Sequence, residues 1–381
     1  MKKVCCILLI LGILFLPQHL HCSTEEILAE QKEELNISSF IKEANQYTKD
    51  TFPNLNMGEL FNSAITGDVD NGILYKAIVA IIGKEIISGI MALVSILVII
   101  VIHSILKTIS EGLENKGVSQ ITYYVEYILI VTLIMTNFTS IIEVVRQTIQ
   151  NLVGFMNSLT PILITLMITT GNITTANVIQ PVILFLISFI GNGILTVILP
   201  LLLVSTVLGI VSNISDKIQI NKLSKYFKSS IVWILGIALT IFVGALSIEG
   251  TLTSSVDGLT AKTAKAAVSN FIPVVGKILG DAVDTVIGCS AVLKNAVGLV
   301  GIIIIIGICI LPIIRLSILT ISYYLATAIC EVIADEKIVK LLEQMAGSFK
   351  ILLAILFATS TMLLIGVTLV IKISNSGLMY R

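Results

Sequence analysis

The sequence has little charge. Asp, Glu, Lys and Arg make up 13% of its 381 residues, and the 24 basic residues are balanced by 24 acidic ones, so the formal net charge is zero. Soluble domains carry about 25% charged residues, and a neutral chain has no overall field that would attract nucleic acid or an acidic substrate. Hydrophobic residues make up 56% of the chain and the mean hydropathy is +1.01. We therefore exclude a soluble globular protein and predict that lipid surrounds most of the chain.

Residues that carry enzyme chemistry are also scarce. The sequence has three histidines, and its six cysteines form no C-x-x-C pair, so neither a zinc site nor a disulfide framework is indicated. It lacks a Walker A glycine loop, an H-E-x-x-H or G-x-S-x-G motif and a dinucleotide-binding fingerprint. We predict no catalytic residues, no cofactor and no metal, and any ATP hydrolysis would belong to a partner.

Residues 1–23 are typical of a secretory signal peptide. Two lysines, Lys2 and Lys3, precede an apolar stretch at 4–16 that is short for a membrane span. The cleavage site is poorly marked, so an uncleaved anchor is the alternative. In either case the following segment would be delivered outside the cytoplasm.

Residues 24–85 form an acidic segment, with eleven acidic residues against five lysines. Apolar residues recur there at helical spacing, which predicts a small extracytoplasmic region of two or three short helices and loops. The run GDVDNG at 67–72 does not have the spacing of a calcium-binding EF-hand loop, and we interpret it as a turn.

Residues 86–371 contain long apolar runs. About 20 residues at 1.5 Å each cross the 30 Å hydrocarbon core of a bilayer, and runs that do not alternate with polar residues predict helices. The fold class is therefore an all-α polytopic membrane bundle. Prolines and a Gly-Asn-Gly sequence predict breaks or re-entrant turns, which gives seven to nine segments: 86–106, 121–142, 152–170, 179–211 (one kinked helix or a hairpin), 229–248, 296–311, 313–332 and 351–371.

Basic residues in short loops predict the orientation. The connector at 212–228 contains Lys222, Lys225 and Lys228 and is the strongest cytoplasmic marker. The tail at 372–381 is also basic and is predicted to be cytoplasmic, so an exported amino terminus favours an odd number of crossings, seven or nine. The three lysines either dock a cytoplasmic partner or simply orient the protein.

The connector at 249–295 is unusually long for a loop. Its pattern predicts two amphipathic helices, broken near Pro273, that lie on the membrane surface or dip into it. Lys277 and Asp281 are spaced as an i,i+4 pair, and Asp284 follows Asp281 by one turn on the same face. These three residues are further candidates for partner docking.

Four polar residues within or beside the apolar runs are candidates for an intramembrane pathway, because such groups are costly unless they are paired or face water. His103 and Glu126 lie near one end of two successive spans, where they could form a proton relay or a structural hydrogen bond. Asn192 lies between two glycines, which indicates either a water-filled path or a packing kink. Arg315 either lines a pathway or extends to the membrane interface.

Several strings of residues resemble, in the same order, the stage III sporulation protein AE family of endospore-forming bacteria: QPVILF at 180–185, VSNISDK at 211–217, LTIFVGALSIEG at 239–250, DGLTAKTAKAA at 257–267 and SNFIPVVGKILGDAVDTVIGCSAVLKNAVGLVG at 269–301. The resemblance implies a subunit of a secretion-like channel between mother cell and forespore that supports late forespore gene expression. It also implies partners: a cytoplasmic ATPase, ring-forming proteins and a forespore protein across the intermembrane space.

We accordingly expect a multi-pass protein of the mother-cell membrane that forms or gates a passage. Two alternatives stay open at this point. One is a stand-alone secondary permease, and the other is a non-conducting membrane scaffold for the ring proteins.

Overall fold

The computed structural model describes the backbone of residues 24–379 except 50, 54, 68–70, 112–115, 215–219 and 272–274, and most side chains in that range. The predicted signal peptide at 1–23 lies outside the described residues. Every regular element in the described part is helical, which confirms the all-α fold class.

Three short helices begin the described chain: α2 (Thr24–Glu34), α3 (Ile37–Thr48) and α4 (Met57–Thr66). The side chain of Asn56 caps α4 by accepting a hydrogen bond from the Gly58 N–H. The helix ends at Gly67, whose φ of +81° favours a residue without a Cβ atom. The prediction of two or three short helices in the acidic segment is confirmed.

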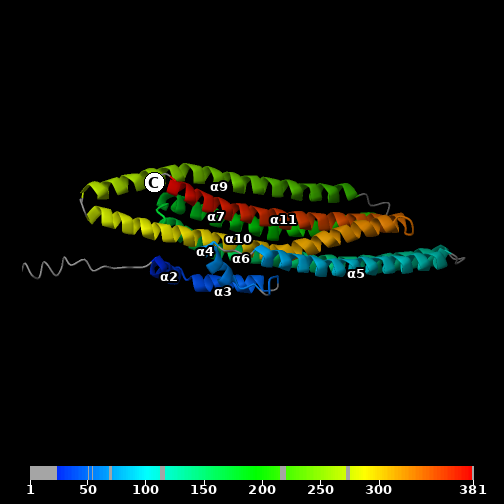
Figure 1. Ribbon diagram of the computed structural model, residues 1–381. Helices are drawn as coiled ribbons and strands as arrows, with labels where there is room; N and C mark the ends of the chain where they lie inside the picture. The colour runs from blue at the N-terminus through cyan, green and yellow to red at the C-terminus, as the bar shows by residue number, and fades with distance from the viewer. Residues whose placement is uncertain are drawn as a thin grey trace, which may run out of the picture.

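Six long helical rods follow, packed side by side and antiparallel (Figure 1). Within the described residues, six stretches are long and apolar enough to cross a membrane. The rods are α5 (Asn71–Glu111), α6 (Lys116–Thr169), the stack of α7 (Ile173–Gly193), η1 (Ile194–Ile198) and α8 (Leu199–Ile214), α9 (Asn221–Phe271), α10 (Val275–Cys330) and α11 (Glu336–Met379).

The predicted breaks at prolines are wrong. Pro161 lies inside α6 and Pro312 inside α10, and both helices continue through them. Residues 152–170 are therefore the end of α6, and the two segments expected around Pro312 are one helix. A proline removes one backbone donor. Pro312 is buried and Pro161 is exposed, and both rods stay helical through the missing hydrogen bond.

The Gly-Asn-Gly sequence does not separate two helices either. The chain continues from α7 into a short π-helix, η1, and then into α8. The hydroxyl of Thr196 donates a 2.7 Å hydrogen bond to the backbone oxygen of Asn192, which satisfies an acceptor where the helical hydrogen-bond pattern changes. Residues 179–211 thus lie in one continuous rod.

Contacts between distant residues define the two ends of the bundle. At one end, Asn172 between α6 and α7 bonds Ser374 near the end of α11. At the other end, Lys228 on α9 bonds the backbone of Gln344 on α11. The lysine-rich connector and the carboxyl end of α11 therefore lie at opposite ends, which disagrees with the prediction that both are cytoplasmic.

The connector at 249–295 is helical on both sides of Pro273, as predicted, since α9 ends at Phe271 and α10 begins at Val275. These helices are not a separate pair, because they are extensions of α9 and α10 (Figure 1). Their location at a membrane surface stays a prediction.

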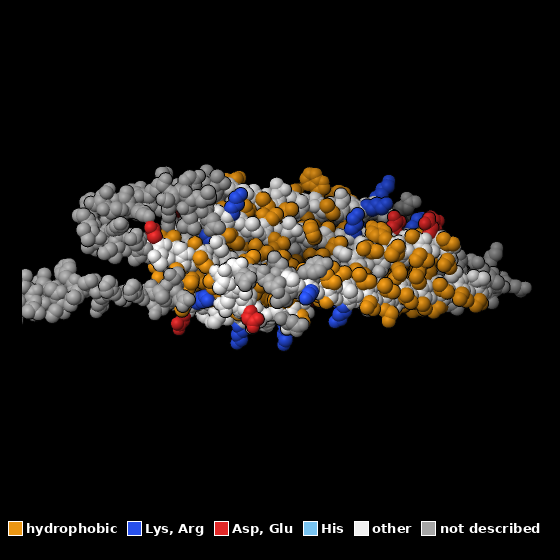
Figure 2. Space-filling view, in the orientation of Figure 1, with side chains coloured by type: hydrophobic (Ala, Val, Ile, Leu, Met, Phe, Trp, Pro, Cys, Tyr) orange, Lys and Arg blue, Asp and Glu red, His pale blue; other side chains and the backbone are white. Residues whose placement is uncertain are grey.

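The bundle has two different halves. In the capped half, which contains α2–α4, the α6–α7 turn and the end of α11, the short helices cover α6 and α10: Phe40 packs 6.1 Å from Phe155, and Ser158 donates a hydrogen bond to Glu43. In the open half, which contains α8 and the start of α9, large apolar side chains are exposed on α5, α9 and the end of α10. Figure 2 shows this apolar surface beyond the charged α2–α4 region.

Candidate functional site

A groove lies in the open half between α5, α6 and α10, with Phe349 of α11 among its lining residues. Its volume is about 320 Å³. All three helices belong to apolar stretches long enough to cross a bilayer. The groove is therefore at membrane depth if the rods cross the membrane.

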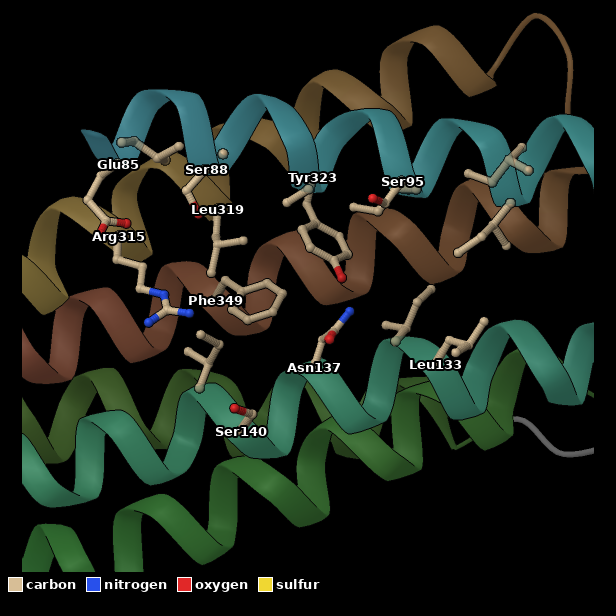
Figure 3. Close-up of a pocket in the computed structure, with 18 of the residues that line it drawn as sticks. Glu85, Ser88, Ser95, Leu133, Asn137, Ser140, Arg315, Leu319, Tyr323 and Phe349 are labelled. Atoms are coloured by element: carbon tan, nitrogen blue, oxygen red, sulfur yellow. The ribbon is translucent and has the colours of Figure 1, made fainter. Parts of the chain in front are cut away.

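Polar and apolar side chains are unevenly distributed along the groove (Figure 3). Glu85 and Arg315 lie at one end, and Ser95 and Leu133 lie towards the other. On α5, the spacing between Glu85, Ser88 and Ser95 places all three on one helical face. The groove thus has a charged end and a mainly apolar end.

The middle of the groove is lined by Asn137 of α6 and Tyr323 of α10, whose side chains point towards each other (Figure 3). The ring of Tyr323 is buried and packs 4.8 Å from the ring of Phe349, measured between centroids. This contact fixes the ring and leaves its hydroxyl directed at the groove.

Close packing of α5 on α10 forms one wall. A Cβ atom added at Gly89 would overlap the side chain of Ile318, and the Ser322 hydroxyl donates a 3.2 Å hydrogen bond to the Gly89 backbone oxygen. Glycine is therefore required here for the helices to approach.

Arg315 and Glu85 make no hydrogen bond or ion pair with any residue in the described part of the chain. Their side chains are exposed and half-buried, respectively. A charge at membrane depth is costly unless a counter-charge, a polar partner or water stabilises it. The charged end of the groove is therefore suited to a polar ligand.

A second polar cluster lies in the capped half and is fully buried. Lys294 of α10 donates a 2.7 Å hydrogen bond to the hydroxyl of Ser374 on α11. The Asn172 amide donates to the same hydroxyl at 3.1 Å and to Thr170 at 3.0 Å. This cluster joins the α6–α7 turn to α10 and α11.

Asp257 of α9 caps the amino terminus of α7. Its two carboxylate oxygens accept hydrogen bonds of 2.9 Å from the backbone N–H groups of Thr174 and Thr175. These donors have no partner within the helix. Gly171, with a φ of +80°, makes the preceding turn possible.

The predicted pathway residues are not brought together. Arg315 lines the groove, whereas Asn192 is exposed on α7 and is not among the lining residues. His103 lies in α5 and Glu126 in α6, but their side chains lie outside the described residues. The proposed relay between them stays a prediction.

The predicted docking residues differ in their surroundings. Lys222 and Lys225 are exposed on α9, but Lys228 is half-buried and donates a 3.1 Å hydrogen bond to the backbone oxygen of Gln344. Asp284 is exposed on α10, while the side chains of Lys277 and Asp281 lie outside the described residues. Lys228 thus holds α9 on α11 and is a poor docking residue.

Sequence reasoning missed five residues of the groove, the buried polar cluster and the cap of α7: Glu85, Asn137, Asp257, Lys294 and Tyr323. A usable signal was present for the groove, because polar residues recur at helical spacing on α5 and α6 within apolar runs. No local signal pairs Asp257 with α7, since their contact joins positions more than 80 residues apart.

The centre of the bundle is filled by apolar side chains. Phe155 and Leu159 of α6, Val300 and Ile304 of α10 and Leu352 of α11 are all fully buried. No group of three or more His, Cys, Asp or Glu side chains in the described part could hold a metal ion. In the described interior these five side chains therefore fill the space between α6, α10 and α11, and no such group forms a metal centre.

Comparison with known proteins covers most of the chain. Residues 55–374 match the family model described as stage III sporulation protein AE. The stage III sporulation protein AE of Bacillus subtilis (strain 168) is 30% identical over 306 residues, which cover 80% of this chain and 77% of that protein. No solved structure matches. The chain therefore belongs to the stage III sporulation protein AE family.

Proposed function

We propose that this protein is the membrane subunit of a sporulation channel complex that links mother cell and forespore, and that it helps to form or gate the passage through the mother-cell membrane. The observation that carries the proposal is the division of the bundle into an open half with an exposed apolar surface and a capped half covered by charged short helices. Lipid would surround the open half, and the capped half would stand in the space between the two membranes.

The lengths of the rods support this arrangement. The 56 residues of α10 extend for about 84 Å at 1.5 Å per residue, more than twice the hydrocarbon thickness of a bilayer. On α9, exposed large apolar residues run from Leu223 to Ile248, a distance of roughly 38 Å that matches a bilayer with part of its interfaces.

The basic residues of the open end support a cytoplasmic location for that end. Lys222, Lys225 and Lys340 are exposed there, as the positive-inside rule requires. The acidic α2–α4 region and the carboxyl end of α11 would then both be extracytoplasmic. This replaces the predicted cytoplasmic tail and the odd number of crossings.

The filled interior makes a passage through a single copy difficult. We therefore place the proposed passage between copies of the chain or between this chain and its partners, where the exposed amide of Asn192 would face water. A secondary permease is less well supported, because such transporters bind substrate at the interface of two repeats near the bilayer midplane. The same filled interior favours a second candidate function, a non-conducting scaffold for the ring proteins.

Single cysteines in a background without native cysteines test the orientation. A membrane-impermeant maleimide should label Lys42→Cys and Lys372→Cys in sporangial protoplasts prepared before engulfment is complete, while the space between the two membranes is still open to the medium, but Lys225→Cys only after permeabilisation. Labelling at 225 without permeabilisation, or its failure at 42, contradicts the proposed orientation.

A second labelling experiment separates passage from scaffold. In the intact complex, a water-soluble maleimide should label Asn192→Cys, while the matched lipid-facing variant Trp233→Cys stays unlabelled. Loss of late forespore reporter expression upon labelling at 192 would support a passage. An unlabelled cysteine at 192 in a functional complex would favour the scaffold.

A further inference from the structure

We propose that the groove between α5, α6 and α10 binds one zwitterionic phospholipid with an ammonium headgroup, such as phosphatidylethanolamine. The lipid phosphate contacts Arg315, its ammonium contacts Glu85, and one acyl chain occupies the apolar end of the groove. This inference requires only that the open half spans a bilayer, so it does not depend on the proposed passage.

The charges at one end of the groove match such a headgroup. Arg315 supplies a cation with several donors, and Glu85 supplies a carboxylate at the same end (Figure 3). Neither makes an ion pair or hydrogen bond within the described residues. Phosphate accepts the directed donors of a guanidinium group, and an ammonium group is attracted to a carboxylate. An anionic phospholipid would satisfy Arg315 but would be repelled by Glu85.

The position of Arg315 along the bundle fixes which end of the groove carries the charges. Gly307 marks where the capped half ends on α10, because a Cβ atom there would lie 3.1 Å from the ring of Phe52. Arg315 follows it by eight residues, or about 12 Å. The charged end of the groove is therefore the end that lies nearer to the boundary between the two halves.

The rest of the groove is suited to an acyl chain. Beyond Asn137 and Tyr323 its lining is mainly aliphatic and includes Ile96, Ile100 and Leu133. Ser95 also lines this part, but its hydroxyl is satisfied by the backbone oxygen of Met91 at 2.8 Å. A soluble phosphate ion would leave these apolar surfaces unfilled, so a lipid fits both ends of the groove better than a free anion.

The test uses the full-length chain in nanodiscs that contain equal amounts of phosphatidylethanolamine and phosphatidylglycerol, with retained lipid measured by native mass spectrometry. We expect about five times as much bound phosphatidylethanolamine as bound phosphatidylglycerol. This is the ratio expected when one lipid makes one additional, partly exposed ion pair. Arg315→Gln should lower retention of both lipids about tenfold, since a charge-assisted hydrogen bond to phosphate is lost. Glu85→Gln should keep a bound lipid but abolish the preference.

Two further variants complete the design. Ser95→Phe fills the apolar end and should reduce retention of both lipids, whereas Lys84→Gln removes an exposed neighbouring cation outside the groove lining and should change nothing. The proposal is overturned if Ser95→Phe retains as much lipid as the unaltered protein. It is also overturned if Glu85→Gln prefers phosphatidylethanolamine as strongly as the unaltered protein does. Both results can be read even if Arg315→Gln fails to fold. A preference for phosphatidylglycerol in the unaltered protein also overturns it.

Discussion

Lys294 and Ser374 are joined by a 2.7 Å hydrogen bond between α10 and α11, and neither side chain is exposed. Asn172 donates to the same serine hydroxyl. The α6–α7 turn, α10 and α11 thus meet at the Ser374 hydroxyl in the capped half. Buried polar groups that lose a partner cost more than the hydrogen bond itself contributes.

Replacing Ser374 with alanine should therefore destabilise the capped half. We expect a loss of about 1–3 kcal/mol in unfolding free energy, because Lys294 and Asn172 each lose an acceptor. Denaturant unfolding in detergent measures the change. Thr359→Val is the matched control, since the buried Thr359 hydroxyl donates only to the backbone of its own helix. An equal effect of the two substitutions would contradict a special role for Ser374.

Asp257→Ala should loosen the amino terminus of α7. Two backbone donors lose their acceptors, and loss of a helix cap costs about 0.5–2 kcal/mol. Asp257→Asn keeps one acceptor oxygen and should have a smaller effect. Hydrogen exchange should show faster exchange at Thr174 and Thr175 in the alanine variant. Unchanged exchange at both amides would rule out this capping role.

Gly307→Ala should weaken the packing of the short helices on α10. The added Cβ atom would lie 2.9 Å from a methyl carbon of Thr48 and 3.1 Å from the Phe52 ring, and overpacking costs about 1–3 kcal/mol. Limited proteolysis should cut the α3–α4 region faster. Gly236→Ala, where a Cβ atom meets nothing within 4 Å, corrects for the higher helix propensity of alanine. Equal cleavage of the two variants would contradict the prediction.

Ionisation of Tyr47 should weaken the packing of α2–α4 in the capped half at alkaline pH. Burial, followed by the nearby charge and hydrogen bond of Glu43, raises the pKa of Tyr47 above its ordinary value of 10.0. The folded state thus favours the neutral phenol, so this contribution to stability is fully present below pH 10.0 and is lost as the pH rises through the folded pKa. Proteolysis of α2–α4 should accelerate above pH 10. Tyr47→Phe should flatten this dependence, and an identical pH profile would refute it.

Lys222→Glu combined with Lys225→Glu should reduce copurification of a cytoplasmic ATPase partner, because both lysines are exposed at the proposed cytoplasmic end. The matched control is Lys42→Glu with Lys49→Glu, two exposed lysines in the capped half. Labelling of Lys372→Cys in the same background checks that topology has not inverted. Full copurification with unchanged topology would remove this docking site.

The sequence predicted the type of the secondary-structure elements better than the residues at which they begin and end. Apolar runs identify helices wherever lipid or a helical core can surround them, and this reasoning correctly assigned a membrane bundle preceded by short helices. It failed at Pro161 and Pro312 because a local rule about a missing backbone donor was applied without knowledge of the neighbouring rods. The basic residues of the tail gave no sign that the end of α11 lies at the opposite end of the bundle from the lysine-rich connector, because only contacts between distant residues show this.

The candidate site was predicted only in part. Arg315 was identified because a charge stands out in an apolar run, and it does line the groove. Glu85 was assigned to the end of the acidic segment at 24–85, whereas α5 begins at Asn71 and carries Glu85 in the same helix as the apolar run. Asn137 and Tyr323 become partners only when α6 and α10 pack together, which is tertiary information that no local pattern contains.

The antiparallel order of the six rods has a consequence for biogenesis. Taken in sequence order they form three helical hairpins, α5 with α6, α7–α8 with α9, and α10 with α11, and each hairpin turns at the open end. In the proposed orientation these turns stay on the cytoplasmic side, where the chain is made, and each connection between hairpins is carried across the bilayer. A truncation between hairpins would then leave complete helix pairs, whereas a truncation inside one would leave a single helix without its partner.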